Sequence, residues 1–106
     1  MKILPEPWKS MTEEQLKGMT EPQARQMLAA VTTPELTKLR ADVRSFRSSE
    51  LMMLLHHGST LADKALPKDP DDIRAPRQYD REEEQLIVAA AAIVVADEFD
   101  RRVPRP

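Results

Sequence analysis

The chain has 106 residues, of which 41% are hydrophobic and 32% are charged, and its formal net charge is −2. This length is typical of one domain, and this balance is typical of a folded protein and not of a disordered one. The absence of cysteine excludes a disulfide framework, a thiolate metal site and a cysteine nucleophile. Residues 1–66 carry nine Lys and Arg against eight Asp and Glu, and residues 67–106 carry seven against ten. Neither half has the basic excess that is typical of a nucleic-acid-binding surface.

The composition also limits the fold class. Glycine occurs only twice, which disfavours tight hairpins because their turns need residues at positive φ. Alternating runs of β-branched and aromatic residues, which are typical of strands, are scarce as well. The sequence therefore predicts an all-α fold.

Residues 1–10 are predicted to form an extended N-terminal arm, because Pro5 and Pro7 hold themselves and the residues before them in extended conformations. Trp8 is the only tryptophan, and we expect it to dock on the core of the chain or on another subunit. A proline and a glutamate stand where a signal peptide would have its apolar run, so we expect a cytoplasmic protein.

Residues 11–66 are predicted to be a helical region, because side chains that cap helices recur along it. Thr12 and Thr20 are each followed three residues later by glutamine, which is the pattern of a capping box, and Gly18 is expected to close the first helix. Thr33 is followed by a proline, which is favoured in the first helical position. Apolar residues then recur every three or four positions, as on one face of a helix. They are Ala24, Met27, Leu28 and Val31, followed by Leu36, Leu39, Val43 and Phe46.

A kink or a restart of the helix is expected at Ser48 and Ser49, because serine side chains compete for backbone hydrogen bonds. The five apolar residues 51–55 cannot share one helical face, so we expect this segment to be buried on more than one side. His56, His57 and Gly58 are predicted to end the helix, with Gly58 in the left-handed cap position and the histidines near the negative end of the dipole. One or two further helical turns are expected over residues 59–66.

Residues 67–79 contain three prolines and few apolar residues, and they are predicted to be a linker. Residues 80–103 are predicted to form the C-terminal helix. Asp80 and Glu83 make a further capping box, while Arg101 and Arg102 suit the negative end of the helix dipole. We therefore expect this helix to run from about Arg81 to Arg102.

The eleven residues 86–96 are all apolar, and they are too few to span a bilayer, which takes about 20. Their bulky side chains are distributed around the helix, so we expect it to be the central helix of the fold. Ala89, Ala92 and Ala96 form a stripe of small residues, where we expect the closest contact with another helix. Because a chain of this size has little apolar material to cover the whole helix, we expect either self-association, as a dimer, or burial against a different protein.

No residue pattern points to catalysis, a cofactor or a metal. Adjacent histidines diverge by about 100° on a helix and cannot easily bind one ion together, so His56 and His57 are interpreted as residues of a helix end. The carboxylates of residues 69–72 lack the ligand spacing and glycine of a calcium loop, and they are interpreted as part of a solvated linker. The acidic residues 82–84 are interpreted as a charged helix start. We therefore predict a protein that is not an enzyme.

DNA binding is the alternative. Residues 20–39 resemble a helix-turn-helix, with an alanine in the first helix, a Val-Thr-Thr turn and a basic second helix. Arg40, Arg44 and Arg47 are expected to share one side of that helix, as contact with a phosphate backbone would favour. The competing interpretation is a solvated rim beside the apolar stripe. The residues of this alternative surface are Lys38, Arg40, Arg44 and Arg47.

The sequence thus predicts a small helical bundle of four to five helices around a central apolar C-terminal helix. The main hypothesis is a protein–protein interaction module, as an accessory, adaptor or inhibitory subunit that self-associates through this helix. The alternative is a transcriptional regulator that binds DNA through residues 20–47. No membrane contact is expected. The residues expected at the protein interface are Trp8, Phe46, Tyr79, Ala89, Ala92, Ile93, Ala96 and Phe99.

Overall fold

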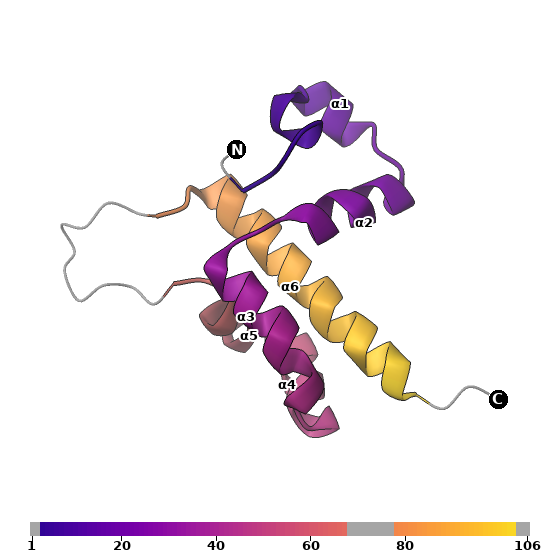
Figure 1. The fold of residues 1–106 in the computed structure, drawn as a ribbon, viewed down its shortest axis with the longest axis vertical. Helices are drawn as coiled ribbons and strands as arrows, with labels where there is room; N and C mark the ends of the chain where they lie inside the picture. Colours follow the sequence, from indigo (N-terminus) through magenta and orange to yellow (C-terminus); the bar gives the residue numbers. More distant parts are fainter. Residues whose placement is uncertain (1–2, 68–77, 104–106) are drawn as a thin grey trace.

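The computed structural model describes residues 3–67 and 78–103, and all regular structure in these two ranges is helical. In chain order the elements are η1 (Trp8–Ser10), α1 (Glu13–Lys17), α2 (Glu21–Ala30), α3 (Pro34–Asp42), η2 (Val43–Ser45), α4 (Ser48–His56), α5 (Gly58–Ala65) and α6 (Arg81–Arg102), where η is a short 3-10 helix. Figure 1 shows a long C-terminal helix, α6, with α2, α3, α4 and α5 against it and α1 farther away, beyond α2. The all-α bundle with a central last helix is therefore confirmed.

The helix starts lie where capping chemistry predicts them. At Thr12, Thr20 and Asp80 both hydrogen bonds of a capping box are formed, and these bonds pair backbone N–H groups that a helix start leaves without partners. Thr33 caps α3 through its hydroxyl, which accepts from the backbone N–H of Leu36 at 3.1 Å. Local side-chain chemistry therefore sets these starts.

The N-terminal arm differs in part from the prediction. Ile3 and Leu4 are buried in the core, and the backbone N–H of Thr32 donates to the carbonyl of Ile3 at 3.2 Å. Beyond them the chain closes into the 3-10 turn η1, in which the backbone N–H of Lys9 donates to the carbonyl of Pro5. The arm is thus folded against its own chain at both ends.

The helix restarts at Ser48 as predicted: α3 ends at Asp42, η2 follows, and α4 begins at Ser48. The side chain of Glu50 accepts from the backbone N–H of Arg47 at the start of α4. The prediction for Gly58 is wrong, because no described glycine has a positive φ. His57, in an extended conformation, ends α4 and precedes α5, so that Gly58 is the first residue of α5.

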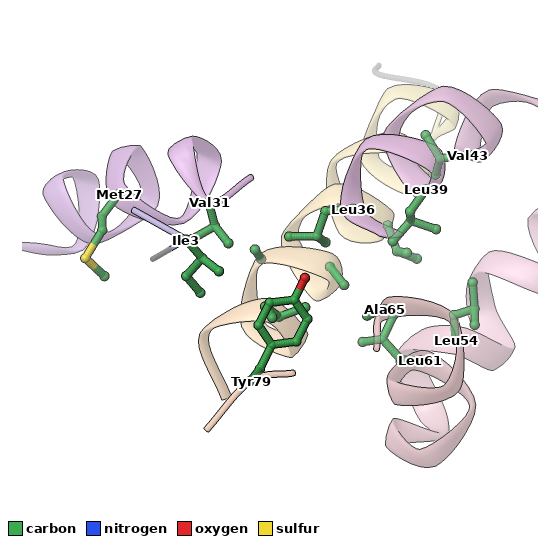
Figure 2. Close-up of a cluster of buried hydrophobic side chains, with 14 of the residues drawn as sticks. Ile3, Met27, Val31, Leu36, Leu39, Val43, Leu54, Leu61, Ala65 and Tyr79 are labelled. Atoms are coloured by element: carbon green, nitrogen blue, oxygen red, sulfur yellow. The ribbon is translucent and has the colours of Figure 1, made fainter. Parts of the chain in front are cut away.

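Helix α6 packs against α2, α3, α4 and α5. Figure 2 shows the core around it, where side chains of α2, α3, α4 and α5 converge together with Tyr79. The fully buried Ile87 and Val95 lie on the α6 side of this core. The shortest principal extent of the molecule is 21 Å, which is about two helix diameters. Two layers of helices cannot enclose α6 on all sides.

The two sides of α6 are therefore buried to different degrees. Its buried hydrophobic residues are Ile87, Ala90, Ala91 and Val95, which lie on one side of the helix at 100° per residue. The alanines in closest contact with the chain's own helices are thus Ala90 and Ala91. Ala89, Ala92 and Ala96 lie on the opposite side and are half-buried. The expectation that this stripe makes the closest helix contact is wrong within one chain, and between chains it stays a prediction.

Arg102 joins the end of α6 to the connection between α3 and α4. Its guanidinium donates to the carbonyl oxygens of Phe46 at 2.6 Å, Arg44 at 3.0 Å and Val43 at 3.3 Å. It also pairs with the buried carboxylate of Glu98 at 3.2 Å. The sequence predicted only a favourable interaction with the helix dipole for this residue.

Candidate interaction surfaces

Helix α4 exposes three large apolar side chains, Met52, Met53 and Leu55, which we call the α4 patch. Their exposed fractions are 49%, 55% and 41%. Leu51 and Leu54, three residues apart, are the buried residues of this helix, so the intervening positions point away from the core. The expectation that residues 51–55 are buried on more than one side is therefore wrong for the single chain. Large exposed apolar patches on folded proteins mark interaction sites.

A second apolar surface lies on α6, opposite its buried side. We call Ala89, Ala92, Ile93 and Ala96 the open face of α6. All four residues are half-buried and none of them is polar; Ala92, at the edge of this face, also packs partly against the core. The small side chains of the three alanines would let the backbone of another helix approach closely, as small residues do at helix interfaces. The structure thus groups four of the predicted interface residues on one surface.

The structure does not bring the four predicted aromatic anchors together on one surface. Tyr79 is only 9% exposed and belongs to the core, so it is not available to a partner. Phe46 and Phe99 are half-buried against the core, and the Nζ atom of Lys64 lies 5.1 Å from the centroid of the Phe46 ring. Trp8 is also half-buried against the chain's own core.

Tyr79 lies close to two carboxylates, Glu35 and Glu83. Burial raises the pKa of the Tyr79 hydroxyl above its ordinary value of 10.0, and the negative charges of Glu35 and Glu83 raise it further. One carboxylate oxygen of Glu35 and one of Glu83 are buried without a hydrogen-bond partner in the described part of the chain. The phenol is therefore held neutral in the folded protein.

This arrangement predicts a loss of stability in alkali. Because the folded-state pKa of Tyr79 is raised, its contribution to stability is fully present below pH 10, the pKa in the unfolded chain. This contribution is lost as the pH rises through the folded-state pKa. Urea unfolding of the wild type between pH 8 and pH 11 should show this fall in stability, and Y79F should show a smaller one. Because the chain has one tyrosine, tyrosinate absorbance reports this group alone. An absorbance pKa at or below 10 would contradict the prediction.

The histidines and carboxylates considered from the sequence can be placed in part of the structure. His56 and His57 are exposed at the junction of α4 and α5, and within residues 3–67 and 78–103 no group of three or more His, Cys, Asp or Glu is arranged to hold a metal ion. Glu83 serves the capping box of α6. The acidic residues 69–72 lie outside the described residues.

The basic residues of the DNA-binding alternative do not lie along one helix. Lys38 is exposed on α3, but the guanidinium of Arg40 donates to the carbonyl of Ala29 at 3.2 Å. Arg44 belongs to η2 and Arg47 precedes α4. The expectation that the three arginines share one side of a helix is wrong, because α3 ends at Asp42.

The N-terminal elements form an open groove that the sequence did not predict. It has a volume of about 550 Å³, and its lining includes no charged side chain. The residues of this groove, which we call the Trp8 groove, are Pro7, Trp8, Met11, Gln15, Gly18, Met19, Gln23 and Gln26. The pattern that could have indicated it is the use of glutamine, and not glutamate, in the first two capping boxes.

Among the described helices, none is both long enough and apolar enough to cross a membrane. Comparisons with protein-family models, with curated proteins and with solved structures found no match for this chain. The surfaces available for a functional interpretation are therefore the α4 patch, the open face of α6 and the Trp8 groove. The first two are apolar and suit contact with other protein surfaces.

Proposed function

We propose that this chain is a non-enzymatic protein–protein interaction module that assembles with copies of itself. The observation that carries the proposal is the α4 patch. Three neighbouring large apolar side chains, each at least 41% exposed, are unfavourable in water, and covering them in an assembly is favourable by roughly 25 cal/mol per Å² of apolar surface. Methionine side chains are flexible and are common at surfaces that bind other proteins.

The open face of α6 supports the same proposal. A symmetric dimer uses one surface patch twice, so the patch must be complementary to itself. An apolar face of small side chains meets this requirement, because two such helices can approach closely without burying a charge. Contacts between copies could cover the open face of α6 and the α4 patch. They would then bury the apolar side chains that a single chain leaves accessible.

Support for the DNA-binding alternative is weaker. Arg40 already donates to the carbonyl of Ala29, and the other two arginines lie on different elements. Contact with a phosphate backbone from one helix face would require these side chains to share that face.

Sedimentation equilibrium tests the proposal. At micromolar and higher concentrations we expect the wild type to have a mass of twice the 12.1 kDa of one chain. M52E combined with M53E should return the mass to that of one chain, because charges in an apolar contact cannot be desolvated without a partner. The matched control is S49E, a change at an exposed position of the same helix outside the patch. A wild type that keeps the mass of one chain at every concentration would overturn self-association.

Peroxide oxidation gives an independent measurement on the same methionines. In dilute protein Met52 and Met53 should oxidise much faster than Met27, which is buried at 8% exposure. Raising the protein concentration should protect Met52 and Met53 in parallel with the increase in mass, while Met27 stays slow throughout. Protection that does not follow the mass would place the contact between copies away from the α4 patch.

A further inference from the structure

The Trp8 groove combines an apolar lining with hydrogen-bond donors. Trp8, Met11 and Met19 supply aromatic and thioether surface, and Trp8 and Met19 also pack against the core. The groove is open and has a volume of about 550 Å³, so a segment bound in it would keep one side in contact with solvent. Since its lining includes no charged side chain, it offers no counter-charge to a phosphate, a carboxylate or an ammonium group.

The capping boxes fix how two of the glutamines are oriented. The Oε1 atom of Gln15 accepts from the backbone N–H of Thr12, and the Oε1 atom of Gln23 accepts from that of Thr20, both at 2.9 Å. The Nε2 atom of each amide is therefore left to donate, and in the described residues no group accepts from it. The indole N–H of Trp8 likewise has no acceptor in these ranges. Three of the side chains that line the groove thus keep a donor without an acceptor in the described residues.

Such a groove discriminates between backbone conformations. An α-helix satisfies its own carbonyl groups internally, so it would leave these donors unpaired. A β-strand presents N–H groups as well as carbonyl groups, and its N–H groups would find few acceptors among these side chains. A polyproline II segment keeps all its carbonyl groups free, and its prolines have no N–H. Pyrrolidine rings also pack well on aromatic surfaces, as in other proline-recognising grooves.

We propose that the Trp8 groove binds an uncharged, proline-rich segment of another protein in the polyproline II conformation. Trp8, Met11 and Met19 contact the proline rings, and the Nε2 atoms of Gln15 and Gln23 and the indole N–H donate to the backbone carbonyl groups. The site is separate from the α4 patch and from the open face of α6. A variant that cannot bind the proline-rich segment should therefore keep the solution mass of the wild type. Ligand binding and self-association can thus be tested separately.

The experiment is a titration of the full chain with decaproline, acetylated at its N-terminus and amidated at its C-terminus so that it carries no charge. Because Trp8 is the only tryptophan, its fluorescence reports the surroundings of this one side chain, which lines the groove. We expect a saturable blue shift with a dissociation constant in the millimolar range or below. A capped alanine-based helical peptide of the same length is the control ligand and should produce no shift. An unchanged spectrum with decaproline, or an equal response to the helical peptide, would overturn the proposal.

Two variants test the donors by calorimetry. W8F keeps an aromatic ring but removes the indole N–H, and it should weaken decaproline binding by about threefold to tenfold. Q26E places a negative charge in the groove at an exposed position and should weaken binding as well. The matched control is Q85E on α6, which makes the same change at an exposed position outside the groove. Equal binding by Q26E and Q85E would contradict the assigned position of the ligand.

Discussion

Replacing Arg102 with alanine is expected to lower the free energy of unfolding by about 3 kcal/mol, because the buried carboxylate of Glu98 loses the less exposed of its two partners. The side chain of Glu98 is 8% exposed and pairs with both Arg101 and Arg102. The substitution also removes the donor to the carbonyl groups of Val43, Arg44 and Phe46. A domain of this size has a total stability of about 5–15 kcal/mol, so urea unfolding should show a large decrease.

Two further substitutions separate the charge of Arg102 from its geometry. R102K keeps the positive charge, but its compact ammonium lacks the planar fork that reaches three carbonyl groups and Glu98 together, so it should recover only part of the loss. R101A removes the other partner of Glu98. Because the side chain of Arg101 is 61% exposed, this substitution should lower the free energy of unfolding by less than about 1 kcal/mol. Equal losses in R101A and R102A would show that Arg102 contributes only its charge.

The substitutions A91L and A92L are expected to affect different properties. A91L should mainly lower the stability of the fold, and A92L should mainly weaken self-association. Ala91 is fully buried, so the larger side chain overpacks the core and should lower stability by about 1–3 kcal/mol. Ala92 is half-buried on the open face of α6. Because Ala92 packs only partly against the core, a leucine there should lower the stability of the single chain by less than A91L does. It should, however, prevent close approach of a second α6 and lower the solution mass.

Thermal unfolding and sedimentation, measured together on both variants, check this pair. The two residues are adjacent and the substitution is the same, so each variant is the control for the other. If A92L unfolds as easily as A91L, the two sides of α6 are not different in burial. If A92L is stable and its mass equals that of the wild type, the open face of α6 does not mediate self-association.

The helix boundaries could be predicted because they depend on local chemistry. Thr12, Thr20, Thr33 and Asp80 each cap the helix that follows, and the expected range of the last helix, Arg81–Arg102, is confirmed. A side chain that reaches its own backbone three residues away needs no information from the rest of the fold. The restart at Ser48 is also confirmed, but the side chain that bonds the local backbone there is that of Glu50 and not of a serine.

The sides that the helices bury could not be predicted in the same way. Residues 86–96 are apolar in every direction, so periodicity does not distinguish Ala91 from Ala92, and only packing does. In α4 the five apolar residues suggested burial on several sides, but no element covers Met52 or Met53. An apolar side chain predicts burial only if the fold supplies a neighbour, and a chain two helix layers thick does not supply one everywhere.

The Trp8 groove was missed for a different reason. Its lining comes from η1, α1 and α2, and the sequence predicted an extended arm in place of η1. Without that turn there is no basis for placing Trp8 beside Gln15 or Gln23. The capping boxes could be predicted from the sequence. That the glutamine amides line a groove depends on η1, which could not. The contact between Arg102 and the α3–α4 connection could not be predicted either, because it joins residues that are far apart in the sequence.

The central position of α6 determines when this protein can fold during its synthesis. Helices α2 to α5 all pack against α6, which the ribosome makes after them. At about 5–20 residues per second, several seconds pass between the completion of α5 and that of α6. During this interval Leu36, Leu51 and Leu61, which become part of the core, have no central helix to cover them. The nascent chain is therefore a candidate for chaperone binding until its last helix emerges.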